Sequence, residues 1–383
     1  MTAIELIKLI PEEVFSDLAV ATKVDHQVKK LSGAVLFKLI LFSMLGCEKL
    51  SLRVLEAFLQ SAAFQSFSQE KVLSSKYNSI RDRICTINAA YFQGLFERIF
   101  HIYNKELKEQ KALSKADSTY VALSAKLFAQ GMQIGPDGAK RQAKYSIYLK
   151  GSLPASVKVF TQQAYISEDK ALSELINEVG CLQEGVVVFD RGVQSRDAFD
   201  TFTSEGKLFI SRAKTNIHLK GACNHPLEAQ PKEASVTITS DQNGYLLKKK
   251  GKKTQHPYRV IKAIINESGE AIWWVTNIMD EEAYTIAHWY QQRWEIEVFF
   301  KFIKQHLNAS HLVSRTENGM KVMIYMTMIV AILLIAYKKI NKIKGFKIAK
   351  LKFVIELEKE IIKTIVVLCG GEPSKAAHLF NSG

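Results

Sequence analysis

The chain has 383 residues, 47% of them hydrophobic, which is enough to bury a large core divided between two or three domains and excludes a disordered chain. Its 52 Lys and Arg residues against 38 Asp and Glu residues give a net charge of +14, which favours a polyanionic partner. Nucleic acid is the first candidate, although a ribosomal or membrane-surface protein would show a similar excess.

The first 108 residues predict a helical N-terminal domain. Apolar residues recur at spacings of three and four in 34–45, 50–64 and 80–103. Residues 74–83 (SSKYNSIRDR) place helix-capping residues before a helix whose first turns carry Arg81 and Arg83. This helix could dock on DNA, but a solvated helix face explains the same charges, because no helix-turn-helix pattern is distinct here.

After residue 111 the apolar pattern becomes strand-like. Residues 116–123 predict a strand that carries Asp117, and 145–149 and 156–160 predict two more strands. An Asp on such a strand is often only a turn residue. Asp117 is therefore a candidate whose weight depends on other acidic residues.

A second aspartate follows an apolar run without alternation, which is typical of a central strand covered on both faces. Residues 185–189 (GVVVF) form this run, and Asp190 stands at its C-terminal end, where α/β sheets place their chemistry. Two helices and a further strand are expected around it, at 168–179, 195–204 and 207–212. Together these elements predict an α/β core whose first part spans 109–213.

Residues 214–270 predict a β-rich insertion in that core. Strands are expected at 235–239, 245–250 and 258–265, and Asn243-Gly244 predicts a hairpin turn between the first two. The insertion has a basic edge that consists of five lysines, namely Lys248, Lys249, Lys250, Lys252 and Lys253. This edge could contact DNA phosphates, but a solvent-exposed face with no ligand explains the lysines equally well.

The stretch from Tyr290 to Lys304 (YQQRWEIEVFFKFIK) predicts a helix, because it has four turns of length and neither Gly nor Pro. It follows an expected core strand at 272–279. On a 3.6-residue period Tyr290, Arg293, Glu297 and Lys304 fall within an arc of about 60° on a mostly apolar helix. Ordinary i,i+4 pairs could explain these charges. Since buried charges are costly, a metal ion with phosphates would satisfy the whole set.

The C-terminal part is helical and apolar. Residues 322–337 form an apolar run of 16 residues, which is shorter than the roughly 20 that a membrane span needs. A helix at about 347–369, stopped by Gly370-Gly371, belongs to a tail at 341–383 that could pair with another protomer. No membrane span is therefore expected.

The cysteines and the N-terminus indicate a cytoplasmic protein. The five cysteines are far apart and show no CxxC pair, which predicts reduced thiols and no zinc site. The first fifteen residues lack the basic segment and apolar core of an export signal.

Three acidic residues suggest a phosphodiester-cleaving metal site. Asp117 and Asp190 at strand ends and Glu297 on a helix supply the hard oxygen ligands that two divalent ions need for this reaction. Arg293 and Lys304 lie where cations would neutralise charge that builds on the phosphorus.

The spacing Tyr290-x2-Arg293-x3-Glu297-x6-Lys304 is similar to the Tyr-Arg-Glu-Lys signature of bacterial DDE transposases of the insertion-sequence-four family. Asp117 in ADST and Asp190 in VVVFDRG match the two aspartate motifs of that family. The resemblance covers about residues 110–340.

This resemblance implies an RNase H-like core at 109–213 and 271–340, interrupted by the β-rich insertion. The first 108 residues match the family only in being helical, and we expect a DNA-binding domain there. It implies a metal-bound triad of Asp117, Asp190 and Glu297 that holds two Mg²⁺ ions, for which Mn²⁺ can substitute. It also implies that Tyr290, Arg293 and Lys304 contact double-stranded DNA at the transposon ends, in a homodimer or a higher synaptic assembly. The expected location is the cytoplasm, in association with the nucleoid.

Three alternatives remain open on the sequence. An RNase H-like nuclease or resolvase would use the same triad without strand transfer. A DNA-binding repressor derived from a transposase would have lost catalysis. A membrane protein anchored through residues 322–337 is the third alternative.

Overall fold

A computed structural model describes residues 1–69, 74–109, 113–123, 131–134, 140–179, 185–227, 229–248, 251–307, 309, 313–314 and 316–376. It divides into two compact units. The first consists of Met1–Lys108, Val121–Ala129 and Lys301–Gly383, and the second of Glu109–Tyr120 and Gln130–Phe300. The finer division into five segments expected from the sequence stays a prediction.

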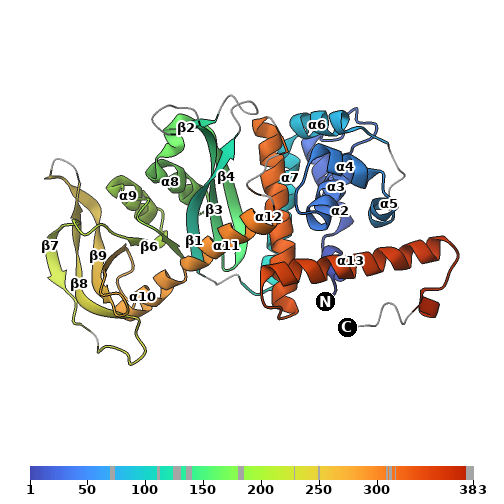
Figure 1. Cartoon of the computed structure of the whole chain (residues 1–383). Helices are drawn as coiled ribbons and strands as arrows, with labels where there is room; N and C mark the ends of the chain where they lie inside the picture. The colour runs from blue at the N-terminus through green and yellow to red at the C-terminus, as the bar shows by residue number, and fades with distance from the viewer. Residues whose placement is uncertain are drawn as a thin grey trace. The chain divides into compact units, whose positions relative to one another are not determined.

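The second unit is built on a sheet of ten strands (Figure 1). Its strand order is β2-β3-β1-β5-β6-β10-β9-β8-β7, and β4 pairs with β3 outside this path. The β1–β5 and β5–β6 pairs are parallel. The pairs β6–β10, β10–β9, β9–β8, β8–β7 and β2–β3 are antiparallel. The strands are β1 (Ser114–Leu123), β2 (Met132–Ile134), β3 (Lys140–Lys150), β4 (Leu153–Phe160), β5 (Val186–Phe189), β6 (Leu208–Arg212), β7 (Leu219–Asn224), β8 (Val236–Leu247), β9 (Lys253–Ile265) and β10 (Ala271–Thr276).

Helices cover both faces of the centre of this sheet, which confirms the predicted α/β class. Val187 and Phe189 of β5 pack into one apolar cluster with residues of α8 (Glu168–Val179) and α9 (Arg196–Ser204). Val188 packs into a second cluster with α10 (Ala283–Gln291). In Figure 1, α9 and α10 lie on opposite sides of the sheet. The run without alternation at 185–189 is therefore a central strand, as predicted.

The hairpin predicted at Asn243-Gly244 is wrong, because β8 runs straight through these residues. Asp241 of β8 is buried and forms an ion pair with Arg259 of β9 (Oδ2–Nη2, 2.6 Å), which holds the strand in its ladder. A Cβ added at Gly244 would lie 3.1 Å from the carbonyl oxygen of Lys220 in β7. The glycine therefore permits close approach of a neighbouring strand rather than a turn.

The single helix predicted from Tyr290 to Lys304 is also wrong in one respect. Helix α10 ends at Gln291 and α11 spans Trp294–His306. Between them the backbone N–H of Arg293 donates to the carbonyl of Tyr290 (3.0 Å), and the N–H of Ile296 donates to that of Arg293 (3.1 Å). These i to i+3 bonds form a tight 3₁₀-like turn, which changes the angular positions expected from an uninterrupted α-helix.

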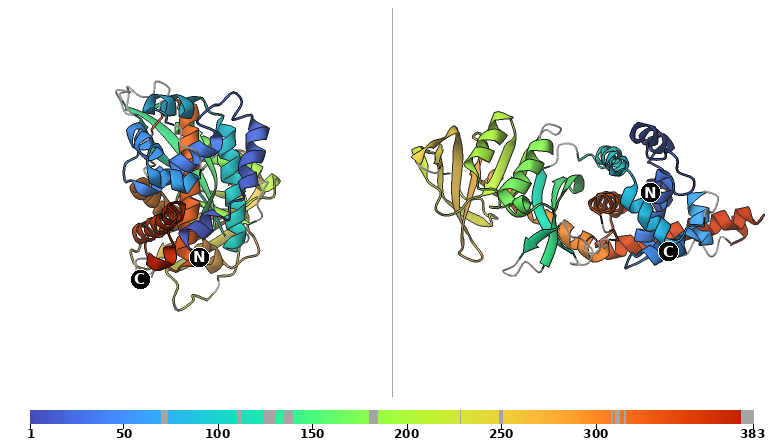
Figure 2. Two further views of the ribbon diagram at one scale, coloured as in Figure 1. Left: turned by 90° about the vertical axis from the view of Figure 1, so that its right-hand side faces the viewer. Right: turned by 90° about the horizontal axis from the view of Figure 1, so that it is seen from above.

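The first unit is helical. Figure 2 shows α12 beside α7 and α13, the helices that it contacts most extensively. The N-terminal segments predicted at 50–64 and 80–103 each divide into two helices, with Ser61 and Asn88 capping the second helix of each pair. The helices are α1 (Ala3–Ile7), α2 (Glu12–Thr22), α3 (Gly33–Gly46), α4 (Leu52–Leu59), α5 (Ala62–Ser68), α6 (Tyr77–Thr86), α7 (Ala89–Glu106), α12 (Glu317–Ile340) and α13 (Phe346–Leu368).

Helix α12 is longer than the apolar run expected from the sequence. Its 24 residues make it, among the described residues, the one helix long and apolar enough to cross a membrane. However, 89% of its most apolar window is buried inside the protein. Packing within the first unit thus accounts for its hydropathy. The four described cysteines, Cys47, Cys85, Cys223 and Cys369, are free thiols, whereas Cys181 lies outside the described residues.

Candidate active site

The two predicted aspartates lie on neighbouring parallel strands at matching positions. The β1–β5 register pairs Ser114 with Val187 and Ala116 with Phe189. One position further, Asp117 stands opposite Asp190. Because neighbouring strands lie about 4.8 Å apart, the register brings the two carboxylates together at the C-terminal end of β5.

Asp117 is short of hydrogen-bond donors. Its Oδ1 accepts from the backbone N–H of Ser118 (2.7 Å). Burial raises the pKa of Asp117 to about 7; the Ser118 N–H and Arg293 oppose this rise, and the negative charges of Glu168 and Asp190 add to it. A carboxylate in these surroundings would be stabilised by a nearby cation.

Asp190 has a partner from α10. The hydroxyl of Tyr290 donates to its Oδ1 (3.1 Å), and the Tyr290 ring packs against that of Trp274 (centroids 5.9 Å apart). Burial, together with the charge of Asp190, raises the pKa of Tyr290 above its ordinary value, so the phenol stays a donor at neutral pH. The buried phenol thus orients Asp190.

Arg293 and Glu297 form an ion pair beside Tyr290. Arg293 Nη2 lies 2.7 Å from Glu297 Oε1, and the Arg293 guanidinium lies 5.8 Å from the Tyr290 ring centroid. The Nε of Arg293 is buried and has no hydrogen-bond partner among the described residues. Arg293 therefore has a donor available for a further acceptor, such as a phosphate oxygen.

The aspartate pair suits a divalent cation better than the full triad does. Two adjacent carboxylates, one of which has a raised pKa, are the hard oxygen donors that such an ion takes. Glu297 is paired with Arg293 instead. Accordingly, in the part of the chain that the structure describes, no three His, Cys, Asp or Glu side chains form a group that could hold a metal ion. To serve as the third ligand, Glu297 would have to leave Arg293 and bind the metal ion instead.

A fourth carboxylate near Asp117, that of Glu168 at the start of α8, was not predicted from the sequence. Its Oε2 accepts from Lys144 (3.1 Å), while its buried Oε1 has no partner among the described residues. A Cβ at Gly192 would lie 2.3 Å from Glu168 Cγ, so this side chain lies against the loop after Asp190. An acidic residue in the first turn of a helix is so common that no pattern distinguishes it.

The remaining predicted DNA contacts belong to both units. Lys304 lies on α11, past the unit boundary at Phe300, and burial lowers its pKa. Arg81 pairs with Asp82 (2.8 Å), whereas Arg83 donates to the carbonyl oxygens of Leu31 and Val24, which fixes it within the N-terminal helices.

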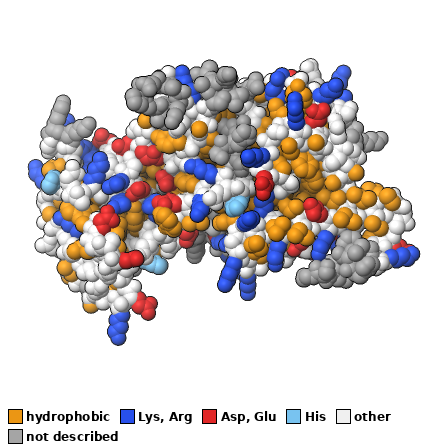
Figure 3. Space-filling view, in the orientation of Figure 1, with side chains coloured by type: hydrophobic (Ala, Val, Ile, Leu, Met, Phe, Trp, Pro, Cys, Tyr) orange, Lys and Arg blue, Asp and Glu red, His pale blue; other side chains and the backbone are white. Residues whose placement is uncertain are grey.

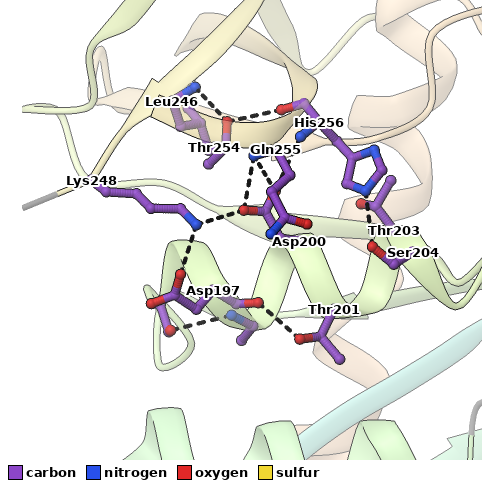
Figure 4. Close-up of polar contacts among 12 residues, drawn as sticks. Asp197, Asp200, Thr201, Thr203, Ser204, Leu246, Lys248, Thr254, Gln255 and His256 are labelled. Carbon is purple, nitrogen blue, oxygen red and sulfur yellow. Dashed lines mark hydrogen bonds and ion pairs between the residues drawn. The ribbon is translucent and has the colours of Figure 1, made fainter. Parts of the chain in front are cut away.

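Lys248 has two carboxylate partners in the second unit. Its Nζ lies 2.7 Å from both Asp197 and Asp200 (Figure 4). The lysine ties the end of β8 to α9, and its predicted contact with DNA stays untested. Lys249 and Lys250 lie outside the described residues.

Comparisons with known proteins converge on one family. The family described as "Transposase DDE domain" matches residues 137–333, just over half of the chain. A protein named as a transposase for insertion sequence element IS5377 of Geobacillus stearothermophilus is 30% identical over 233 residues, or 60% of this chain and 58% of that protein. A protein named as a transposase for element IS4SA of Synechocystis sp. is 27% identical over 264 residues, or 66% of this chain and 70% of that protein.

The chain thus spans less than two thirds of the first relative. Among solved structures, a piggyBac transposase synaptic complex with hairpin DNA is similar with a TM-score of 0.48 and 11% identity, over 95% of this chain and 82% of that chain. The family match includes Asp190, Tyr290, Arg293 and Glu297 and begins after Asp117.

Proposed function

This chain belongs to the transposase DDE domain family, and from that premise we propose that it is a cut-and-paste DNA transposase of the insertion-sequence-four type. It binds terminal inverted repeats, cleaves the DNA strand to free a 3′-hydroxyl, and joins that hydroxyl to target DNA. One observation carries the proposal: Asp117 lies opposite Asp190 on parallel strands, and the hydroxyl of Tyr290, the first residue of the Tyr-Arg-Glu-Lys signature, donates a hydrogen bond to Asp190.

The proposed chemistry assigns a role to each residue around the aspartates. Asp117, Asp190 and Glu297 would hold two Mg²⁺ ions, or Mn²⁺ in their place, which when bound supply an activated water or hydroxyl and stabilise the leaving oxygen. Tyr290 orients Asp190 through its hydroxyl. Arg293, whose buried Nε has no hydrogen-bond partner among the residues that the structure describes, binds a phosphate oxygen and releases Glu297 as it does so.

Double-stranded DNA is the proposed partner. The net charge of +14 supports it, since phosphate contacts provide most of the sequence-independent binding. Lys304 is assigned to the backbone of the transposon end. We also propose that the protein acts in the cytoplasm at the nucleoid, where this DNA partner lies.

Assembly of at least a dimer on DNA is also part of the proposal. Figure 3 shows hydrophobic side chains gathered along α13. Ile348, Leu351, Ile355 and Ile362 of this helix are 41–55% exposed and recur at helical spacing, so they lie on one face. A second copy of this face would cover them. Leu351→Glu is expected to reduce the mass measured by light scattering on end DNA to that of a single copy.

A plasmid assay tests the function. The substrate is a supercoiled plasmid that carries the DNA flanking the reading frame, incubated with Mn²⁺ and a second target plasmid. Cleaved ends and joined products are expected from the natural chain, and neither from Glu297→Gln. Glu317→Gln, in an exposed pair with Lys321 on α12, is the matched control and should keep both.

The outcomes separate the alternatives. Cleavage without joining would favour a nuclease. DNA binding without cleavage or metal binding would favour a repressor. Undiminished cleavage by Glu297→Gln would show that this glutamate is no metal ligand.

A further inference from the structure

One buried lysine lies on the aspartate strand. Lys115 of β1 is two residues before Asp117, so both side chains project from the same face of the strand. Lys115 is only 2% exposed. Its Nζ donates to the carbonyl oxygen of Gly151 (2.9 Å) and to Glu295 Oε2 (2.8 Å). A buried ammonium needs such partners, and the charged one comes from the helix of Glu297.

Glu295 and Glu297 both lie in the first turn of α11. The ion pair with Lys115 therefore fastens that turn to the strand of Asp117. On the other side of the α10–α11 junction, Tyr290 donates to Asp190. The 3₁₀-like turn between the two helices is thus held at both ends, by one bond to each aspartate strand.

We propose that Lys115 and Glu295 are positioning residues that fix the first turn of α11 on β1. They thereby hold Glu297 close enough to Asp117 and Asp190 for the three carboxylates to bind a divalent cation together. This inference rests on the proposed function. Neither residue contacts DNA or metal in this role. Glu295 is 55% exposed on its side chain, so a purely stabilising surface pair is the competing explanation.

The direction in which each substitution changes the metal affinity distinguishes a positioning role from a purely electrostatic effect of the two charges. If only charge mattered, removal of the Lys115 cation would strengthen binding of a divalent cation, and removal of the Glu295 anion would weaken it. If the pair positions α11, both changes weaken binding. Outer-shell residues of this kind change metal affinity by roughly ten- to a hundredfold.

The experiment is a calorimetric titration of the DNA-free full chain with Mn²⁺. Lys115→Met and Glu295→Gln are each expected to raise the Kd by about tenfold or more, and the double variant by no more than the larger single effect. Lys158→Met is the matched control, because Lys158 forms an ion pair with Glu174 (3.0 Å) elsewhere in the same unit. It should bind Mn²⁺ like the natural chain.

Asp117→Asn is titrated alongside, so that two kinds of failure stay distinguishable. Opposite shifts for Lys115→Met and Glu295→Gln, or natural affinity for both, would overturn the positioning role while loss of binding in Asp117→Asn upholds the metal site. Natural affinity in Asp117→Asn would overturn the proposed function and, with it, this inference. If Lys115→Met does not fold, Glu295→Gln is titrated at about 0.1 M and about 1 M salt, because salt screens a charge effect at a distance but not a positioning effect. About tenfold weaker binding that persists at high salt supports the role, whereas natural affinity, or weakening that high salt abolishes, overturns it.

Discussion

Asp117 and Asp200 are two largely buried carboxylates of the same unit, yet their surroundings are opposite. Asp200 accepts from the backbone N–H groups of Gln255 (3.0 Å) and His256 (3.2 Å), from the Tyr258 hydroxyl (3.1 Å) and from Lys248 (Figure 4). Burial alone would raise its pKa, but these donors hold the pKa below its ordinary value. Asp117 has the Ser118 N–H and neighbouring anions, and its pKa is about 7.

The difference distinguishes a structural acid from a functional one. At Asp200 the fold supplies every donor that a buried carboxylate needs, so the group stabilises the junction of β8, β9 and α9. At Asp117 the fold leaves the negative charge unbalanced, which costs stability unless a cation binds. The predictions below test this contrast, beginning with the largest effect.

Asp117→Asn is expected to stabilise the metal-free protein at pH 8. In the unfolded chain Asp117 ionises near its ordinary value of 3.8, whereas in the folded chain it ionises near 7. Between these values the folded state binds more protons, so its stability falls as the pH rises and the loss is complete above pH 7. At about 1.4 kcal/mol per pKa unit, this loss is up to about 4 kcal/mol, and Asn does not incur it.

Urea unfolding in EDTA at pH 4 and pH 8 measures this effect. The variant and the natural chain should be alike at pH 4 and differ at pH 8. A variant that is less stable at both pH values would show that Asp117 is a structural acid like Asp200.

Asp200→Asn should have the opposite consequence. Removal of its charge leaves Lys248 with the exposed Asp197 as its remaining acidic partner, and a broken buried pair costs about 3 kcal/mol. The same unfolding measurement should show this loss at pH 8. Calorimetry should show unchanged Mn²⁺ affinity in the folded variant. Weaker Mn²⁺ binding would mean that the two acids are coupled.

Sequence patterns predict the parts of this fold that local forces determine. The helix at 168–179 has the bounds expected, and the run before Asp190 is the central strand β5, because periodicity and length specify both. Asp190 follows the end of β5, as expected, but the strand end predicted for Asp117 is wrong, because β1 begins at Ser114 and Asp117 lies within it. The register of β1 against β5, which places Asp117 opposite Asp190, is a tertiary contact that the sequence pattern did not predict.

Tertiary contacts determine the parts that sequence patterns do not predict. Asn243-Gly244 has strong local turn preference, but pairing of β8 with two strands and the buried Asp241–Arg259 bond override it. Likewise, Glu168 approaches Asp117 only through the packing of α8 on the sheet, and no local sequence feature encodes that approach.

Tyr290→Phe tests the contrast between carboxylates that have donors and those that lack them, because it leaves Asp190 short of donors, as Asp117 is. It removes the hydroxyl that donates to Asp190, and a hydrogen bond to a charged group is worth about 1.5 kcal/mol. Stability should fall by that amount, and DNA cleavage by about tenfold. Tyr284→Phe on the same helix is the control and should stay within about 0.5 kcal/mol of the natural chain. Equal effects from both variants would mean that the Asp190 bond contributes nothing specific.

The smallest effect concerns Lys304 and Lys248. It tests whether a lysine that already forms ion pairs within the protein, as Lys248 does, still binds DNA. Lys248 contacts two carboxylates, whereas Lys304 is assigned to a phosphate. The logarithm of the DNA-binding constant falls as the logarithm of the salt concentration rises. Lys304→Ala should make this slope less steep by about 0.9, the value for one phosphate contact on duplex DNA. Lys248→Ala should leave the slope unchanged even if it weakens the fold. A lower slope for Lys248→Ala would show that DNA displaces Asp197 and Asp200 from this lysine, and the basic edge predicted from the sequence would then be part of the DNA-binding surface.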